Sequence, residues 1–377
     1  MSASADIPVE TVSFVEDPAA FHDMLDRCVA LVGPPRAMVW QMPRSAYSPE
    51  IVVASVDGAL IGAALTSGRP HTAVRKIVDL WRDARAPEGT GAALVGTVVD
   101  DARARGLVAV TWQWRPAWEA APADPGPADQ GFVPMGRPYA SAPTTWGEVE
   151  GAVRWLTPAT VKRLPYYGQT MDFTCGAASI IMALEAAGTG RFVTGGAEAF
   201  EGNHAREMEL WRQATNMPAC EPVGLAITAS TAWPSADRPG VTDVYLSVDG
   251  PVLLESYDGP EAAWRTALQR ESWRTADRLG LPIHRRWLPI EEIVALIGRG
   301  RRLALLIDEV LMHGATEPHW VLAHSVVGDC VVVEDPWFDV ARGESWVDGH
   351  ALAIPVGDLD RMTRWGDPPY RGVIVLE

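Results

Sequence analysis

Residues 166–188 read YYGQTMDFTCGAASIIMALEAAG, a loop rich in aromatic residues and glycine that runs into an apolar, alanine-rich segment. From Cys175 to Ala187 there is no proline, most residues are strong helix formers, and Gly188 is a typical C-terminal stop. The pattern predicts a buried helix that begins at Cys175. Unpaired N–H groups and the positive end of the helix dipole favour a thiolate there, as a nucleophilic cysteine requires. The alternative is a cysteine packed at the start of a core helix, and a partner base distinguishes the two.

A candidate partner base lies far downstream, within residues 317–337. Two runs rich in β-branched residues flank Gly328-Asp329 and predict a β-hairpin. His319 begins the first strand and Asp335 ends the second, so both stand at the same end of the ribbon. Side chains alternate along a strand, so a strict two-residue loop would put the two on opposite faces. We therefore expect a three-residue loop or a one-residue bulge, which brings them onto one face.

The order and spacing of these residues resemble a known family. His319 follows Cys175 by 144 residues and Asp335 follows by another 16, as in papain-like cysteine peptidases. Gln169, six residues before the cysteine, matches the oxyanion-hole glutamine of that fold. The motifs QTMDFTCG, HWV and VEDP are most similar to the C39 peptidase-like branch, and the resemblance covers residues 155–377.

The resemblance implies a papain-like fold, with a helix packed on an antiparallel sheet, and a Cys–His–Asp triad. The Cys175 thiolate would attack a carbonyl, His319 would take up and return the proton, and Asp335 would orient the imidazole. The Gln169 side chain and the Cys175 N–H would hold the oxyanion. We expect acyl transfer, with hydrolysis of a peptide or amide bond as the first choice and no cofactor required. Transfer to an amine, as in an amide synthase or transpeptidase, and a catalytically silent peptide-binding module stay open as alternatives.

The first half of the chain predicts a second domain with the element order β-α-β-β-β-α-β. The predicted strands cover residues 8–14, a hairpin over 50–64, 74–81 and 107–114, with helices after Asp17 and before Gly106. This order resembles the GCN5-related N-acetyltransferase (GNAT) fold over residues 8–146, a mixed sheet with helices. The sequence thus predicts an α+β protein with a GNAT-like domain at 1–146 and a C39-like domain at 147–377.

In the GNAT family a glycine-rich turn before a helix binds the pyrophosphate of acetyl-CoA. Gly89 and Gly91 match this turn, but Ala86 stands where a basic or amide residue is typical, and Glu88 adds negative charge. We therefore interpret the domain as degenerate, used to recognise substrate or to dimerise. Binding of acetyl-CoA through Gly89 and Gly91 is the alternative.

Composition narrows the possible partners and location. The chain has 32 Lys and Arg against 48 Asp and Glu, a net charge of −16 that argues against nucleic acid or an anionic membrane as main partner. Four scattered cysteines without a C-x-x-C pair indicate reduced thiols in the cytoplasm. No signal peptide or membrane-spanning run is visible. We expect a peptide or amide substrate, and the oligomeric state stays open.

For the other histidines and cysteines named here we expect structural roles. His319, His324, Cys330 and Asp335 are residue types that bind metals, but their spacing is not zinc-like and we expect no metal site. His324 is predicted to be a core histidine. Cys28, Cys220 and Cys330 are predicted to be structural, with Cys28 on the apolar face of the first helix.

Overall fold

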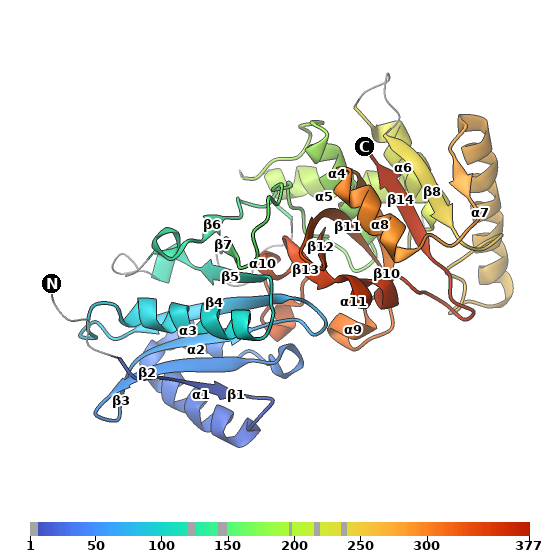
Figure 1. The fold of residues 1–377 in the computed structure, drawn as a ribbon. Coiled ribbons are helices and arrows are strands. Elements are labelled where there is room, and N and C mark those ends of the chain that lie inside the picture. The colour runs from blue at the N-terminus through green and yellow to red at the C-terminus, as the bar shows by residue number, and fades with distance from the viewer. Residues whose placement is uncertain (1–6, 119–125, 142–148, 196–197, 215–218, 235–239) are drawn as a thin grey trace. The chain divides into compact units, whose positions relative to one another are not determined.

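The structure is a computed structural model, and it describes residues 7–118, 126–141, 149–195, 198–214, 219–234 and 240–377. The chain forms two compact units, each with a seven-stranded sheet (Figure 1). Unit 1 comprises Met1–Gly136, Thr144–Ala159 and Phe338–Asp348, and unit 2 comprises Arg137–Pro143, Thr160–Trp337 and Gly349–Glu377. The α+β class predicted from the sequence is confirmed. The predicted boundary between residues 146 and 147 lies outside the described residues.

The sheet of unit 1 has the order β1-β2-β3-β4-β5-β7-β6, in which β4 and β5 pair in parallel and the other neighbours are antiparallel. The predicted order of strands and helices is confirmed from β1 to β5, and α2, β6 and β7 are additional elements that were not predicted. Its strands are β1 (Val9–Ser13), β2 (Glu50–Val56), β3 (Ala59–Ser67), β4 (Val74–Arg82), β5 (Ala109–Trp114), β6 (Val133–Pro134) and β7 (Glu150–Trp155). Its α-helices are α1 (Pro18–Val32), α2 (Pro34–Trp40) and α3 (Thr90–Ala104).

Both faces of this sheet are buried. Along β2, Val52 packs in one apolar cluster with Leu94 of α3, while its neighbour Ile51 packs in a second cluster with Phe21 of α1. This division follows from the alternation of side chains along a strand. Cys28 belongs to the α1 cluster and is fully buried, as predicted. Helices on both faces explain why these strands are apolar at successive positions.

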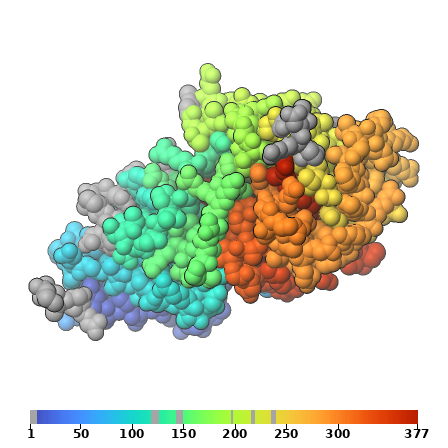
Figure 2. Space-filling view, turned by 45° about the horizontal axis from the view of Figure 1, so that its top comes forward, coloured from blue at the N-terminus to red at the C-terminus, as the bar shows by residue number. Residues whose placement is uncertain are grey.

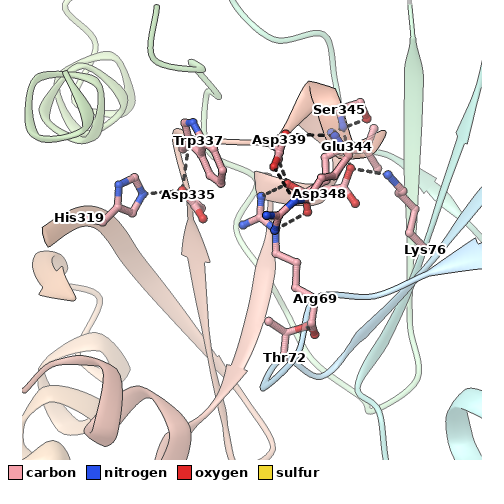
Figure 3. A network of polar contacts seen from close by, with 12 residues as sticks. Arg69, Thr72, Lys76, His319, Asp335, Trp337, Asp339, Glu344, Ser345 and Asp348 are labelled. Carbon is pink, nitrogen blue, oxygen red and sulfur yellow. Dashed lines mark hydrogen bonds and ion pairs between the residues drawn. The ribbon is translucent and has the colours of Figure 1, made fainter. Parts of the chain in front are cut away.

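Residues 338–348 come from the last tenth of the sequence yet pack within unit 1. Arg69, just after β3, donates to both carboxylate oxygens of Glu344, at 2.7 Å from Nε and 2.9 Å from Nη2 (Figure 3). The two side chains are only 1% and 2% exposed. Lys76 of β4 pairs with Asp348, where burial lowers the pKa of Lys76 and the carboxylate opposes that shift. Buried, paired charges therefore attach this segment to the sheet.

The Arg69–Glu344 pair yields a prediction about stability. Arg69→Ala would leave the Glu344 carboxylate buried without its bidentate partner, so we expect a loss of about 3–5 kcal/mol in the free energy of unfolding. Arg103→Ala is the control, because its ion pair with Asp100 is exposed on the α3 surface and should contribute less than about 1 kcal/mol. Urea unfolding followed by circular dichroism measures both. Equal, small losses would contradict the assignment.

The sheet of unit 2 has the order β13-β12-β11-β10-β14-β8-β9, with β8 and β9 parallel and the other neighbours antiparallel. Its strands are β8 (Val241–Leu246), β9 (Ile283–His284), β10 (Arg302–Asp308), β11 (Pro318–Val327), β12 (Cys330–Glu334), β13 (Leu352–Pro355) and β14 (Gly372–Leu376). Its longer helices are α4 (Cys175–Ala186), α5 (Ala199–Ala214), α6 (Pro222–Ala232), α7 (Gly259–Leu279) and α8 (Ile290–Gly298). The shorter helices are α9 (Val310–His313), α10 (Trp346–Gly349), which runs from unit 1 into unit 2, and α11 (Val356–Met362).

Helix α4 is the buried helix that the sequence predicts. It begins at Cys175 and is followed by Gly188, whose φ of 92° is in the left-handed region that favours glycine. The Ser179 hydroxyl donates to the carbonyl of Trp320 on β11 at 3.0 Å, which joins the helix to the sheet. The expected arrangement of a helix packed on a largely antiparallel sheet is therefore confirmed.

Helix α7 lies at the surface of unit 2 (Figure 2). Its side chains Trp264 and Leu268 are 43% and 44% exposed, whereas Gln269 and Ala276 are buried. This division is that of an amphipathic surface helix. In the described part of the chain, every helix is too short or too polar to cross a bilayer.

Candidate active site

The hairpin of β11 and β12 brings His319 and Asp335 together. Its turn is the two-residue loop Gly328-Asp329, and the register of the two strands shifts by one residue at His324. We expected either a three-residue loop or a one-residue bulge, and the structure has the bulge, which turns the Asp335 side chain to the face that carries His319. The Nε2 atom of His319 lies 2.7 Å from Oδ1 of Asp335 (Figure 3).

Asp335 is fully buried and held by several hydrogen bonds. Its Oδ1 accepts the Trp337 N–H at 2.9 Å, and its own N–H donates to the Gly349 carbonyl at 2.9 Å. Its carbonyl accepts the Tyr166 hydroxyl at 2.7 Å, from the loop before α4. These contacts leave the carboxylate one orientation, directed at the imidazole.

His319 lies between two carboxylates. Its Nδ1 atom is 3.0 Å from Oε1 of Glu309, a residue that the sequence analysis missed, and its Nε2 atom faces Asp335. Burial acts to lower the pKa of His319, but Glu309, Asp335 and a hydrogen bond to Cys175 raise it well above its ordinary value. The two carboxylates therefore favour the doubly protonated ring over the neutral one. The sequence held no signal for Glu309, because the pairing of β10 with β11 positions it.

Cys175 is the first residue of α4 and contacts His319. It is 4% exposed and lines a cleft of about 200 Å³. The walls of this cleft include three carboxylates and three aromatic rings, from Asp172, Glu255, Glu317, Phe173, Tyr257 and Trp365. The structure thus joins three of the predicted residues, Cys175, His319 and Asp335, in one cluster beside an accessible cleft.

Gln169 is the fourth predicted residue and lies in the loop before α4. Its backbone N–H donates to the Pro336 carbonyl at 2.8 Å, next to Asp335 in the chain. Its side-chain Nε2 donates to the Met171 carbonyl at 2.9 Å, so the amide donor is occupied in this conformation. The Oε1 atom is buried and has no hydrogen-bond partner within the described residues. An oxyanion held by Gln169 would therefore have to replace the Met171 carbonyl.

His324 is buried, as predicted, and belongs to a cluster that the sequence analysis did not foresee. Glu334 lies between His324, at 3.1 Å from its Nε2, and His350, at 2.5 Å from its Nδ1. Burial acts to raise the pKa of Glu334, but His350 and His324 lower it to about 2. Glu334 ends β12 and Asp335 directly follows it, so their side chains point to opposite faces of the hairpin. The cluster is a buried ion-pair network beside the hairpin.

The turn before α3 is where the pyrophosphate of acetyl-CoA would bind in unit 1, so its backbone and charges show whether the cofactor fits. Gly89 has a φ of 88° and precedes the helix, whose first turn has no side-chain cap, so the backbone offers N–H groups to a pyrophosphate. The charge at the turn does not fit, because Glu88 is exposed there and Arg85 pairs with Asp83 at 3.2 Å. Gly91 is buried within the first turn of the helix. The backbone of the turn suits the cofactor and its charges do not.

Comparison with known proteins places the chain in a family. Residues 164–377 match the family described as "DUF3335: Peptidase_C39 like family". The match covers more than half of the chain, which therefore belongs to this family, and the C39-like resemblance is confirmed. A search of curated proteins finds no match.

Solved structures similar to the N-terminal part are GNAT acetyltransferases. A putative GNAT-family acetyltransferase from Desulfovibrio desulfuricans is 20% identical and covers 40% of this chain and 98% of its own, with a TM-score of 0.30. A putative acetyltransferase from Salmonella typhimurium, solved with its cofactor acetyl-CoA, is 13% identical. The match covers 42% of this chain and 98% of the other, also with a TM-score of 0.30. A putative acyl-CoA N-acyltransferase from Klebsiella pneumoniae is 13% identical. The match covers 40% of this chain and 98% of the other, with a TM-score of 0.29. At these scores the similarity defines no function for unit 1.

The charge at the turn yields a prediction about cofactor binding. Because Glu88 repels phosphate, we expect isothermal titration calorimetry of the full chain with acetyl-CoA to show no saturable low-micromolar binding. Glu88→Lys reverses the charge on the same backbone and is the matched comparison. A low-micromolar signal from the unaltered protein would contradict the interpretation of a degenerate domain.

Proposed function

We propose that unit 2 is a cysteine-dependent acyl-transfer enzyme that hydrolyses a peptide or amide bond. The observation that carries the proposal is the cluster of Cys175 at a helix N-terminus, His319 in contact with it, and Asp335 at 2.7 Å from the imidazole. Membership in the Peptidase_C39 like family supports the same chemistry. A module that only binds peptides would not need this arrangement of three ionisable groups.

In the proposed reaction the Cys175 thiolate attacks the carbonyl carbon and forms a tetrahedral adduct. His319, protonated between its two carboxylates, gives a proton to the departing nitrogen as the C–N bond breaks and a thioester remains on the cysteine. The neutral imidazole then removes a proton from a water molecule, which attacks the thioester carbonyl. The acid leaves, and the thiolate and the imidazolium are restored. Asp335 keeps the ring in position throughout.

The oxyanion of the adduct needs donors. The Cys175 N–H is at the first position of α4, where backbone N–H groups have no partner within the helix. The Gln169 amide would supply a second donor after releasing the Met171 carbonyl. An oxyanion donor of this kind typically lowers the barrier by about 3–4 kcal/mol.

Transfer of the acyl group to an amine is the second candidate. The cleft beside Cys175 is lined by Asp172, Glu255 and Glu317, and carboxylates attract a cationic amine. The aromatic ring of Trp365 in the same wall favours such a cation further. An amine acceptor would attack the thioester in the place of water, with the same role for His319.

The proposal predicts the order in which the thiols react. Iodoacetamide near neutral pH should label Cys175 first, because it lines the cleft at a helix N-terminus. Burial raises the pKa of Cys28 and Cys330 to about 12 and that of Cys220 well above its ordinary value, so these thiols should react slowly. Intact-protein mass spectrometry with peptide mapping measures the order.

The controls for labelling are Cys28→Ala, which should keep the fast modification, and Cys175→Ala, which should lose it. Labelling of all four thiols at one rate would contradict the assignment of Cys175 as nucleophile.

Turnover gives the direct test. A library of fluorogenic peptides identifies a substrate, and mass spectrometry of the products with and without added amines distinguishes hydrolysis from aminolysis. Cys175→Ala and His319→Ala should each abolish turnover, and Cys28→Ala should retain it. Turnover that persists in both site variants would refute the proposal.

A further inference from the structure

Glu309 has no role in the triad described so far, yet it approaches the imidazole as closely as a hydrogen-bonded partner. Its Oε1 atom is 3.0 Å from Nδ1 of His319, on the side of the ring opposite to Asp335. We propose that Glu309 is a positioning residue that holds the Nδ1 edge of His319 and keeps the ring doubly protonated for its partnership with Cys175. This inference rests on the proposed function.

The backbone around Glu309 is firmly held. Glu309 directly follows β10, which pairs with β11 so that Ile307 stands opposite His319. The Glu309 N–H donates to the Glu317 carbonyl at 3.2 Å, and the Glu309 carbonyl accepts the Met312 N–H at 2.9 Å. The residue is 8% exposed. Its carboxylate is therefore directed at the ring by the sheet register and by the start of α9, and little solvent screens it.

The chemistry follows from counting donors. A neutral imidazole has one N–H, so it can donate to one of two carboxylates and leaves the other unpaired. The doubly protonated ring has an N–H for Glu309 and one for Asp335. Its hydrogen bond with Cys175 must share one of these two N–H groups. Each carboxylate also stabilises the positive charge, since an opposite charge within about 4–6 Å shifts a pKa by about 1–3 units. Asp335 alone would hold Nε2, and Glu309 adds the second contact.

Three ionisable groups face His319 from the elements packed around it. They are Glu309 after β10, Asp335 after β12, and Cys175 at the start of α4. Burial acts to lower the pKa of His319, and all three groups act to raise it. Removing the charge of Glu309 must therefore lower the pKa of His319, and the imidazolium is then lost at a lower pH than in the unaltered protein.

The variant Glu309→Gln removes the charge and keeps the size of the side chain. Asp308→Asn is the matched control, because its carboxylate accepts the Val310 N–H at 3.0 Å and lies on the neighbouring, partly exposed position. Glu309→Asp keeps the charge on a shorter side chain, so the proposal can still be tested if the glutamine variant does not fold. All are made in the full chain.

The first readout is the titration of the His319 ring, followed by NMR of protein labelled at histidine and assigned with His319→Gln. We expect its midpoint to fall by about 1–3 pH units in Glu309→Gln, to recover in part in Glu309→Asp, and to stay unchanged in Asp308→Asn. An unchanged midpoint in a folded Glu309→Gln protein overturns the inference, whether or not the protein shows turnover.

The second readout is the pH dependence of kcat/KM on a substrate found by the peptide library. Its alkaline limb reports loss of the imidazolium proton, so it should move to lower pH in Glu309→Gln and stay in place in Asp308→Asn. A shifted NMR titration in a protein without turnover would keep the positioning role and refute the proposed function. A shifted titration with an unmoved alkaline limb would refute the role of Glu309 in the reaction.

Discussion

A single extra residue in one strand determines whether this protein can have a catalytic histidine and acid. His319 and Asp335 lie on strands joined by a two-residue turn, which by itself would direct them to opposite faces. The bulge at His324 shifts the alternation of side chains by one residue, so both side chains lie on the same face. The Nε2 atom of His319 is then 2.7 Å from Oδ1 of Asp335. Everything proposed for the site depends on this shift, because without it Asp335 would lie on the opposite face and could not orient the imidazole beside Cys175.

Burial then makes the charges in this hairpin interdependent. His319 and Glu334 are both buried, and neither could keep its charge without partners. His319 has carboxylates at both ring nitrogens, and Glu334 has two histidines, so each face of the hairpin carries paired charges. The same requirement explains the Arg69–Glu344 pair in unit 1. In these three places buried charges are held by oppositely charged partners, and removal of one partner is costly.

Local features of this chain were predictable from its sequence, and contacts between distant segments were not. Helix α4, the β11–β12 hairpin and the order along the chain of the elements from β1 to β5 were predicted, because each has a periodic or turn signal in consecutive residues. A common face for His319 and Asp335 was expected from either a longer loop or a bulge, and the structure has the bulge. Glu309 and the membership of residues 338–348 in unit 1 were not predicted. Both depend on contacts between segments that are distant in sequence, and such contacts leave no local pattern.

The sequence by itself determined the elements, since helix dipoles and strand alternation are properties of short stretches. The residue types of the candidate site came from the order and spacing of Cys175, His319 and Asp335, which resemble those of a known family. Only the tertiary structure decided which carboxylates reach the imidazole and how the Gln169 amide is occupied. The physical reason is that the repeat of a helix or strand is set by neighbouring residues in the chain. The distance between two charged side chains depends instead on how whole strands pair and pack.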